Sequence, residues 1–257
     1  MKIKYHLSIV AMLATQVAYA DDAPPTPEKK TNAQNTTQEA WQGSVEFGVI
    51  ATTGNSDTTN LNGKLNLVQQ LESWRNTYTL TSISADSDNE KTEEHYRGTV
   101  QGDYIINDRQ FWYVRGSYDK DLFSGYEYQS SASTGYGNRF WQEDDGSYLE
   151  ASAGLGYRVN RIDDDNTTED SESTPIVRFS ATYEKHLSTS SIFKQVLSTE
   201  IGTDNANSIT ESVTSLQANI IDDLAMKLSY RVEYSSDVPS GTERMDTETT
   251  VSVLYSF

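Results

Sequence analysis

Apolar and polar residues alternate along the last eleven positions, Thr247 to Phe257. A period of two places successive side chains on opposite faces of a β-strand, so this stretch predicts a strand with one apolar face. Such a strand suits a membrane β-barrel, in which the last strand pairs with the first and leaves no open edge in lipid. The apolar positions are Val251, Val253, Tyr255 and Phe257.

The same alternation recurs along the chain from Trp41 onward. Each segment is about as long as a tilted strand must be to cross a bilayer, and single-chain bacterial barrels have an even number of strands. The sequence therefore predicts an all-β protein, a transmembrane antiparallel up-and-down β-barrel of about 12 strands that occupies residues 41–257. The predicted strands are Gln42–Thr52, Thr58–Gln70, Arg75–Ala85, Glu93–Ile105, Gln110–Asp121, Tyr128–Arg139, Ser147–Asn160, Pro175–Leu187, Ile192–Gly202, Ile209–Ile221, Leu224–Ser235 and Thr247–Phe257.

The connections between these segments fall into two groups. One group is short, as at Leu71–Trp74 and Asp222–Asp223, and the other holds the longest and most acidic connections, such as Arg161–Thr174. Outer-membrane barrels have short periplasmic turns and longer outer loops. We therefore expect the outer membrane of a Gram-negative bacterium, with periplasmic N- and C-termini. The expected partners are outer-membrane lipid and lipopolysaccharide, and the barrel-assembly machinery acting through the C-terminal strand.

All four tryptophans lie close to the predicted periplasmic strand ends. Aromatic rings sit at headgroup depth in outer-membrane barrels. The sequence therefore predicts an aromatic girdle at this end, to which Phe111 and Phe140 would also belong. Its principal members are Trp41, Trp74, Trp112, Trp141 and Phe257.

The first twenty residues have the features of a secretory signal peptide. Lys2 and Lys4 precede a short apolar core, and residues 18–20 (AYA) supply a cleavage site. Removing residues 1–20 takes away two lysines, so the formal charge changes from −18 to −20. Such acidity argues against nucleic acid as a partner. Residues 21–40 contain prolines and a run of Asn, Thr and Gln, which predicts a disordered periplasmic tail.

The polar positions of the strands carry both signs of charge and would face the lumen. A narrow interior requires such a balance, because a lone buried charge is costly. A filled interior braced by ion pairs and a narrow polar conduit both remain open, since twelve strands fall between filled eight-stranded and open sixteen-stranded barrels. The predicted lumen-lining residues are Arg97, Asp103, Arg115, Asp119, Glu150, Arg158, Arg178, Glu184, Lys227, Arg231 and Glu233.

Three stretches of the chain resemble a known family. They read TGNSDTTNLNGKLNL at residues 53–67, YDKDLFSGYEYQSSASTGY at 118–136 and GLGYRV at 154–159. They resemble the YdiY-like family of outer-membrane proteins described as salt-induced, a domain of unknown function, over roughly residues 43–257. The resemblance implies an outer-membrane barrel of undefined activity and supplies no catalytic residues. Its salt-induced label concerns expression rather than mechanism.

Candidate chemistry is sparse in this sequence. His95 and His186 remain after signal cleavage, cysteine is absent, and spacing alone does not define a Ser–His–Asp arrangement. The acidic runs at 86–90 and 163–166 lack the turn glycine and distal glutamate of an EF-hand loop. We therefore expect no catalytic, cofactor or metal site, and a protein that is not an enzyme.

The expected function is that of an outer-membrane barrel, either structural or a narrow polar or ion channel, linked to salt or envelope stress. Two alternatives stay open at this point: an outer-membrane enzyme of the lipid hydrolase type, and a soluble periplasmic β-barrel binder. In the soluble form the apolar faces would point inward and the charged faces outward. Periodicity alone does not choose between the two orientations.

Overall fold

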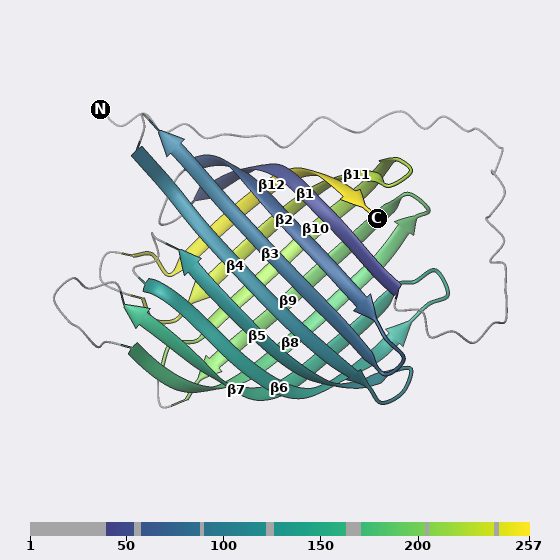
Figure 1. The fold of residues 1–257 in the computed structure, drawn as a ribbon, viewed down its shortest axis with the longest axis horizontal. Coiled ribbons are helices and arrows are strands. Elements are labelled where there is room, and N and C mark those ends of the chain that lie inside the picture. The colour runs from purple at the N-terminus through teal and green to yellow at the C-terminus, as the bar shows by residue number, and fades with distance from the viewer. Residues whose placement is uncertain are drawn as a thin grey trace. The chain divides into compact units, whose positions relative to one another are not determined.

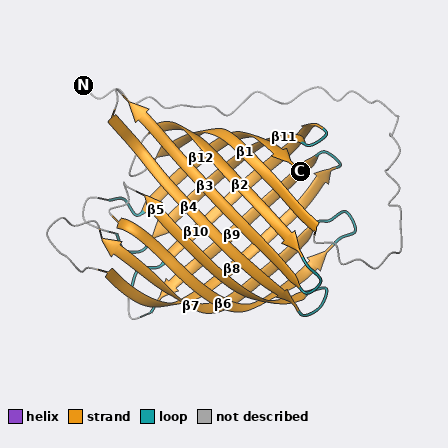
Figure 2. Ribbon diagram, viewed as in Figure 1, coloured by secondary structure: helices purple, strands orange, loops and turns teal. Residues whose placement is uncertain are grey.

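The structure is a computed structural model that describes residues 40–53, 58–87, 90–121, 126–162, 171–203, 206–238 and 242–257. The expected signal peptide at 1–20, the tail at 21–40 up to its last residue, and the acidic run at 163–166 lie outside the described residues. The described ranges form twelve antiparallel strands that close into one barrel (Figures 1 and 2). No helix in these ranges is long and apolar enough to span a membrane.

Each strand pairs with the next in the chain, and the last pairs with the first. The closing register sets Ser44 opposite Ser256 and Thr53 opposite Thr247. The predicted up-and-down barrel is thus confirmed, and the largest difference in bounds is at β8, which begins at Ser171 instead of Pro175. The strands are β1 (Ala40–Thr53), β2 (Thr58–Gln70), β3 (Trp74–Ser87), β4 (Glu90–Ile105), β5 (Gln110–Asp121), β6 (Tyr126–Gln142), β7 (Tyr148–Ile162), β8 (Ser171–Ser188), β9 (Ser191–Gly202), β10 (Ile209–Ile221), β11 (Leu224–Ser235) and β12 (Met245–Ser256).

The apolar side of the sheet faces outward. On β12, Val251 and Val253 are exposed, whereas the intervening Thr250 and Ser252 are buried in the lumen wall. A polar interior inside an apolar wall is the arrangement that a barrel needs in lipid, where the outward side chains replace water with hydrocarbon. A soluble barrel would have the opposite arrangement, so this orientation contradicts that alternative.

The two ends of the barrel differ in their connections. The end that also holds Ala40 and Phe257 has brief turns only, and we call it the short-turn end. The opposite end has the three longest connections between strands, residues 163–170, 203–208 and 236–244, and we call it the long-loop end. The brief turns are residues 71–73, 106–109, 143–147, 189–190 and 222–223.

One of these turns is tied to the neighbouring strand by a buried serine. The backbone amide of Ser147 donates to Asp145 Oδ1 at 2.8 Å, and its hydroxyl accepts from the amide of His186 at 3.0 Å. Hydrogen bonds from the Ser147 hydroxyl and amide lower the pKa of the Asp145 carboxyl. Gly146 has a φ of 90°, a conformation that favours glycine, so this turn is specified by its sequence.

Aromatic residues at the short-turn end divide between two faces. Trp41, Trp74, Trp112 and Phe257 are exposed on the outer wall, and Trp141 is half-buried against the Tyr183 ring at 6.0 Å. The assignment of Phe111 to the girdle is wrong, because its side chain is 4% exposed and faces inward. Its ring fills the space above Gly137, where an added Cβ would lie 2.1 Å from Phe111. The neighbouring Trp112 faces outward, as strand alternation requires.

Strands β6 and β7 approach closely where Gly135 lies opposite Gly154. A Cβ on Gly154 would lie 2.3 Å from both the Thr134 carbonyl oxygen and the Tyr113 hydroxyl. We expect Gly154→Ala to lower the free energy of unfolding by about 1–3 kcal/mol, because the added methyl overpacks the interior. Urea unfolding of the folded barrel, followed by tryptophan fluorescence, measures this change.

The matched control for this substitution is Gly116→Ala on β5. A Cβ at Gly116 meets nothing within 4 Å. Removing a glycine from a strand interior should therefore be neutral or stabilise the barrel by about 0.5–1 kcal/mol. Equal losses at the two glycines would show that close approach of β6 and β7 is not what the chain requires.

Candidate functional site in the barrel lumen

The lumen contains a polar cavity of about 370 Å³. All twelve strands contribute side chains to its lining, which includes seven lysines and arginines, six aspartates and glutamates, and His95. The cavity wall is therefore close to neutral, although the whole chain has a formal charge of −18. The charges are unevenly distributed, because one cluster of side chains has an excess of carboxylates and another has an excess of arginines.

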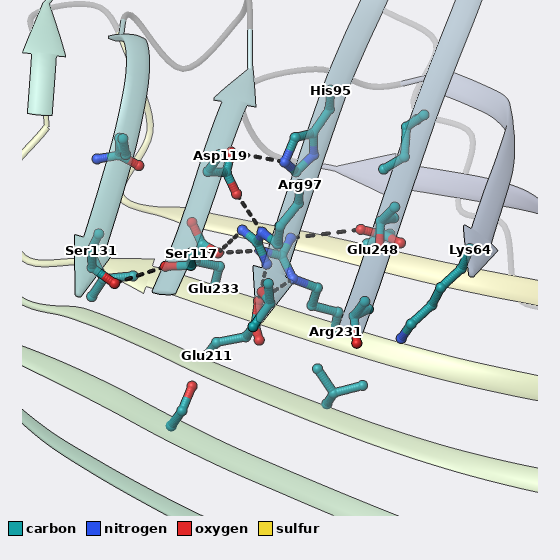
Figure 3. A pocket seen from close by; sticks show the side chains of 18 of the residues that line it. Lys64, His95, Arg97, Ser117, Asp119, Ser131, Glu211, Arg231, Glu233 and Glu248 are labelled. Atoms are coloured by element: carbon teal, nitrogen blue, oxygen red, sulfur yellow. Dashed lines mark hydrogen bonds and ion pairs between the residues drawn. The ribbon is translucent and has the colours of Figure 1, made fainter. Parts of the chain in front are cut away.

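Arg97 of β4 crosses the lumen to the opposite wall. Its guanidinium contacts Asp119 on the adjacent β5, and it also donates to Glu211 on β10 at 2.5 Å. A third contact, to Glu233 on β11, measures 3.2 Å (Figure 3). Because β4 and β10 are six strands apart in the ring of twelve, the contact between Arg97 and Glu211 spans the full width of the barrel.

Arg231 of β11 lies beside Arg97 and shares its carboxylates. Arg231 Nε donates to Glu211 at 2.7 Å, and the guanidinium also contacts Glu233 and lies 3.6 Å from Glu248. Two arginines face four carboxylates, so this group has a net charge of −2 when His95 is neutral. We call it the crossing cluster, and it consists of Arg97, Arg231, Asp119, Glu211, Glu233 and Glu248.

A second group has the opposite balance. The Glu200 carboxylate on β9 lies 3.9 Å from Arg115 Nη1, 3.9 Å from Arg158 Nη1 and 3.8 Å from Arg178 Nε. These separations exceed the roughly 2.7–2.9 Å of a charge-assisted hydrogen bond. Three cations around one anion leave a net charge of +2, and we call these four residues the arginine cluster.

Arg158 is the most buried member of the arginine cluster, with 2% of its surface exposed. Its Nη2 donates to the backbone carbonyl of Asn207. In the described part of the chain, its Nε and Nη1 find no hydrogen-bond partner. A buried donor left without a partner costs about 1–3 kcal/mol. Arg158 therefore keeps two donors in the cavity wall that no described protein group uses.

Lysines line a further part of the cavity. Lys227 Nζ donates to Glu46 at 2.8 Å, and the Ser252 hydroxyl donates to the same carboxylate at 3.4 Å. Lys64 lines the same cavity and stands apart from the dashed contacts in Figure 3. Two lysines and one glutamate give this part of the wall, on β1, β2 and β11, a net charge of +1.

Nearer the short-turn end, balanced ion pairs fill the lumen. Arg75 donates to Asp103 at 2.7 Å and to Glu150 at 3.5 Å, which joins β3 to β7 across the interior. Arg139 also donates to Glu150, at 3.0 Å. With Lys194 donating to Glu184 at 2.8 Å, three cations meet three anions. We call these six residues the lattice, and each cation in it has a direct hydrogen bond to a carboxylate.

Aromatic rings fill the space between these charges. The Arg75 guanidinium lies 5.5 Å from the Phe111 ring centre, and Arg139 lies 4.7 Å from the ring of Tyr148. Tyr113, which is fully buried, lies 5.9 Å from Arg178. Cation–π contacts at these distances are attractive. Phe111 and Tyr148 therefore pack against arginines of the lattice, and Tyr113 packs against Arg178 of the arginine cluster.

The predicted lumen-lining residues all lie inside the barrel and are divided among these groups. Four are in the crossing cluster, three in the arginine cluster, three in the lattice, and Lys227 pairs with Glu46. The sequence analysis missed Arg75 and Tyr113. Both follow the strand alternation, as Arg75 shows by sharing its side of β3 with Thr77 and Thr79. Their contacts in the lumen become visible only in the folded barrel.

The two histidines occupy different levels of the lumen. His95 Nε2 lies 3.0 Å from Asp119 Oδ1, beside the crossing cluster. His186 Nε2 lies 3.7 Å from Glu184 in the lattice. Within the described ranges, His, Asp and Glu side chains form no group of three that could hold a metal ion. The acidic side chains at these two levels are instead engaged by arginines, lysine and histidine.

A closed twelve-stranded barrel with an apolar outer wall and a charged lumen defines a transmembrane β-barrel protein. The chain belongs to the family described as "Protein of unknown function, DUF481", whose model matches residues 45–257. It is 24% identical over 223 residues to the uncharacterized protein YdiY of Escherichia coli (strain K12), covering 84% of this chain and 83% of that protein. The resemblance to the YdiY-like family is thus confirmed.

Solved structures with the same architecture include the NanC porin. It is 11% identical, with a TM-score of 0.53, covering 82% of this chain and 98% of NanC. The translocator domain of the autotransporter NalP from Neisseria meningitidis is also similar, at 10% identity and a TM-score of 0.49 over 88% of this chain and 90% of that domain. At such identity, the likeness to NanC shows a shared porin-like barrel fold.

Proposed function

We propose that this protein is an outer-membrane barrel that acts as a narrow polar conduit for small ions. The observation that carries this proposal is the cavity of about 370 Å³, which all twelve strands line and to which ten of them contribute ionisable side chains. Apolar residues of similar volume often brace an interior as well as buried ion pairs do, because they avoid the cost of desolvating charges. Charged rings, by contrast, are the means by which many channels select ions.

The size and the crossings of the lumen limit what such a conduit would carry. The Arg97–Glu211 contact crosses one level, and the Arg75–Glu150 contact crosses another nearer the short-turn end. Inorganic ions and small charged solutes fit between these crossings, and passage requires the crossing pairs to part. Dissolved ions weaken ion pairs, although they screen partly buried pairs such as these less than exposed ones. We therefore propose that passage rises with salt concentration, which would connect the barrel to salt or envelope stress.

Single-channel recording in planar bilayers tests this function. We expect small, resolved conductance steps from the purified barrel, with the open fraction rising as potassium chloride is increased. The increase in open fraction separates the proposed opening from the ordinary rise in bulk conductivity. Silence over many verified insertions would reject the conduit and leave a bracing role for the charged lumen.

We further propose that the short-turn end faces the periplasm and that the outer wall contacts lipid and lipopolysaccharide. Short turns at one end, together with the tryptophans on the outer wall near that end, support this orientation. An epitope tag placed immediately before Ala40 should react with antibody only after the outer membrane is permeabilised. Labelling of intact cells would contradict the orientation.

A further inference from the structure

We infer that the arginine cluster is a binding site for a small oxyanion, that is, a phosphate, sulfate or carboxylate group. Its three arginines come from β5, β7 and β8 and line the lumen cavity with Glu200 among them. The inference deepens the proposed conduit and rests on it in one respect, because the anion must reach the lumen from solution. It concerns what is bound in the lumen, which conductance alone does not reveal.

The donors for such an anion are already in the cavity wall. Arg158 is 2% exposed, and its Nε and Nη1 have no hydrogen-bond partner among the described residues. These two nitrogens point from different edges of the planar guanidinium, because its Nη2 donates to Asn207, and each can donate a hydrogen bond to an oxygen of a bound phosphate or carboxylate. Arg178 is also buried and lines the same cavity.

Glu200 leaves these donors available instead of using them. Its carboxylate stays 3.8–3.9 Å from all three guanidinium groups, and it accepts a hydrogen bond from the Ser131 hydroxyl at 3.1 Å. It lowers the repulsion between three arginines without satisfying them. The cluster keeps a net charge of +2, which a dianionic or monoanionic ligand would neutralise wholly or in part.

Four other arginines of the lumen form direct ion pairs, as expected of residues that stabilise the barrel interior. Arg97, Arg231, Arg75 and Arg139 each donate directly to carboxylates, in hydrogen bonds that reach 3.5 Å at most. Their positive charge is matched or exceeded by the anions around them. The arginine cluster differs in both respects, because it has one carboxylate for three arginines and that carboxylate lies 3.8–3.9 Å from them. Arg139 also has an unpaired buried Nε, but its Nη2 donates to Glu150.

The crossing cluster gives the lumen an internal polarity that would position the anion. Its net charge of −2 lies in the same cavity as the net +2 of the arginine cluster. An anion entering the lumen is repelled by the first group and attracted by the second. Binding is therefore confined to the wall formed by β5, β7, β8 and β9.

Isothermal titration calorimetry of the folded barrel in detergent, with inorganic phosphate as the probe at low ionic strength, tests this site. We expect the wild-type protein to bind one phosphate. Arg158→Gln should weaken binding by about tenfold or more, because it removes a positive charge and two unpaired donors. Glu200→Gln should tighten binding, because it removes a negative charge that repels the anion and keeps all three arginines. Sulfate should compete with phosphate, and the same concentration of chloride should compete less.

The control is Arg139→Gln, which removes a lumen arginine from the lattice and should leave phosphate affinity unchanged. Heat-modifiable gel mobility verifies that each variant is folded, and Glu200→Gln keeps the test decisive if Arg158→Gln does not fold. No phosphate binding by the wild type, or unchanged affinity in Glu200→Gln, would overturn the inference. Conductance steps without phosphate binding reject the site alone, whereas phosphate binding without conductance rejects only the conduit.

Discussion

Arg97→Gln is expected to lower the free energy of unfolding by about 2–4 kcal/mol, between the cost at an exposed ion pair and that at a fully buried one. The guanidinium of Arg97 contacts Asp119, Glu211 and Glu233, and its side chain is 28% exposed. Without it, Arg231 would face four carboxylates alone. Urea unfolding in detergent or in lipid vesicles, read by tryptophan fluorescence, measures the loss.

The same substitution should also change conduction. Removing Arg97 opens the crossing between β4 and β10 and changes the net charge of the crossing cluster from −2 to −3. The passage becomes wider and more attractive to cations, because rings of carboxylates favour cations. Planar bilayers should therefore show larger steps and a reversal potential shifted toward cation selectivity. Smaller or unchanged steps would mean that Arg97 does not obstruct the passage.

Two comparisons isolate the crossing from a general loss of charge. Arg161 pairs with Glu127 at 2.6 Å, and both side chains are exposed, so Arg161→Gln should cost less than about 1 kcal/mol. The double variant Arg97→Gln/Glu211→Gln restores the net charge of −2 and should recover part of the lost stability. A cost at Arg161 equal to that at Arg97 would show that the crossing cluster is not specially stabilising.

The alternation of apolar and polar residues was sufficient to predict the barrel architecture. The alternation was weakest at strand β6, and the structure explains why. The lumen side of β6 is formed by Ser131, Ser133, Gly135 and Gly137, which are small and buried. Small residues carry little hydrophobic signal, although their alternation with the exposed residues of the outer wall is regular. At Gly137 the ring of Phe111 from β5 occupies the space of a side chain, and at Gly135 the backbone of β7 comes too close for one. The reasons for these two glycines therefore lie on other strands.

The partners across the lumen were beyond what the sequence can predict. Strand alternation shows that Arg97 and Glu211 both face inward, but not that they meet. Their contact depends on how the register staggers β4 against β10 through the five strands between them, and small shifts accumulate around a barrel. The arginine cluster is more local, because Arg178 and Glu200 are register partners on adjacent strands, but the sequence does not show that Arg115 from β5 and Arg158 from β7 reach the same glutamate.

Leu228→Lys should be the most harmful single change on the outer wall. Leu228 lies near the middle of β11, in a row of exposed apolar residues that follows the register across five strands. The row consists of Leu216, Leu228, Val251, Val49 and Leu61. A lysine at the midplane of a barrel wall costs about 2–4 kcal/mol in lipid, because the ammonium loses its water. Urea unfolding in lipid vesicles should show this loss.

The depth dependence of this cost tests the membrane location itself. Ile220 is exposed on the same wall, but it lies next to the end of β10 at the short-turn end. Ile220→Lys should cost only about 0–1 kcal/mol, because an ammonium at headgroup depth keeps its hydration. If the wall faced water, both lysines would be tolerated alike. A small and equal loss of stability at the two positions would therefore contradict a membrane location for this barrel. A loss of stability that is larger at Leu228 than at Ile220 is explained by hydrocarbon around the middle of the wall.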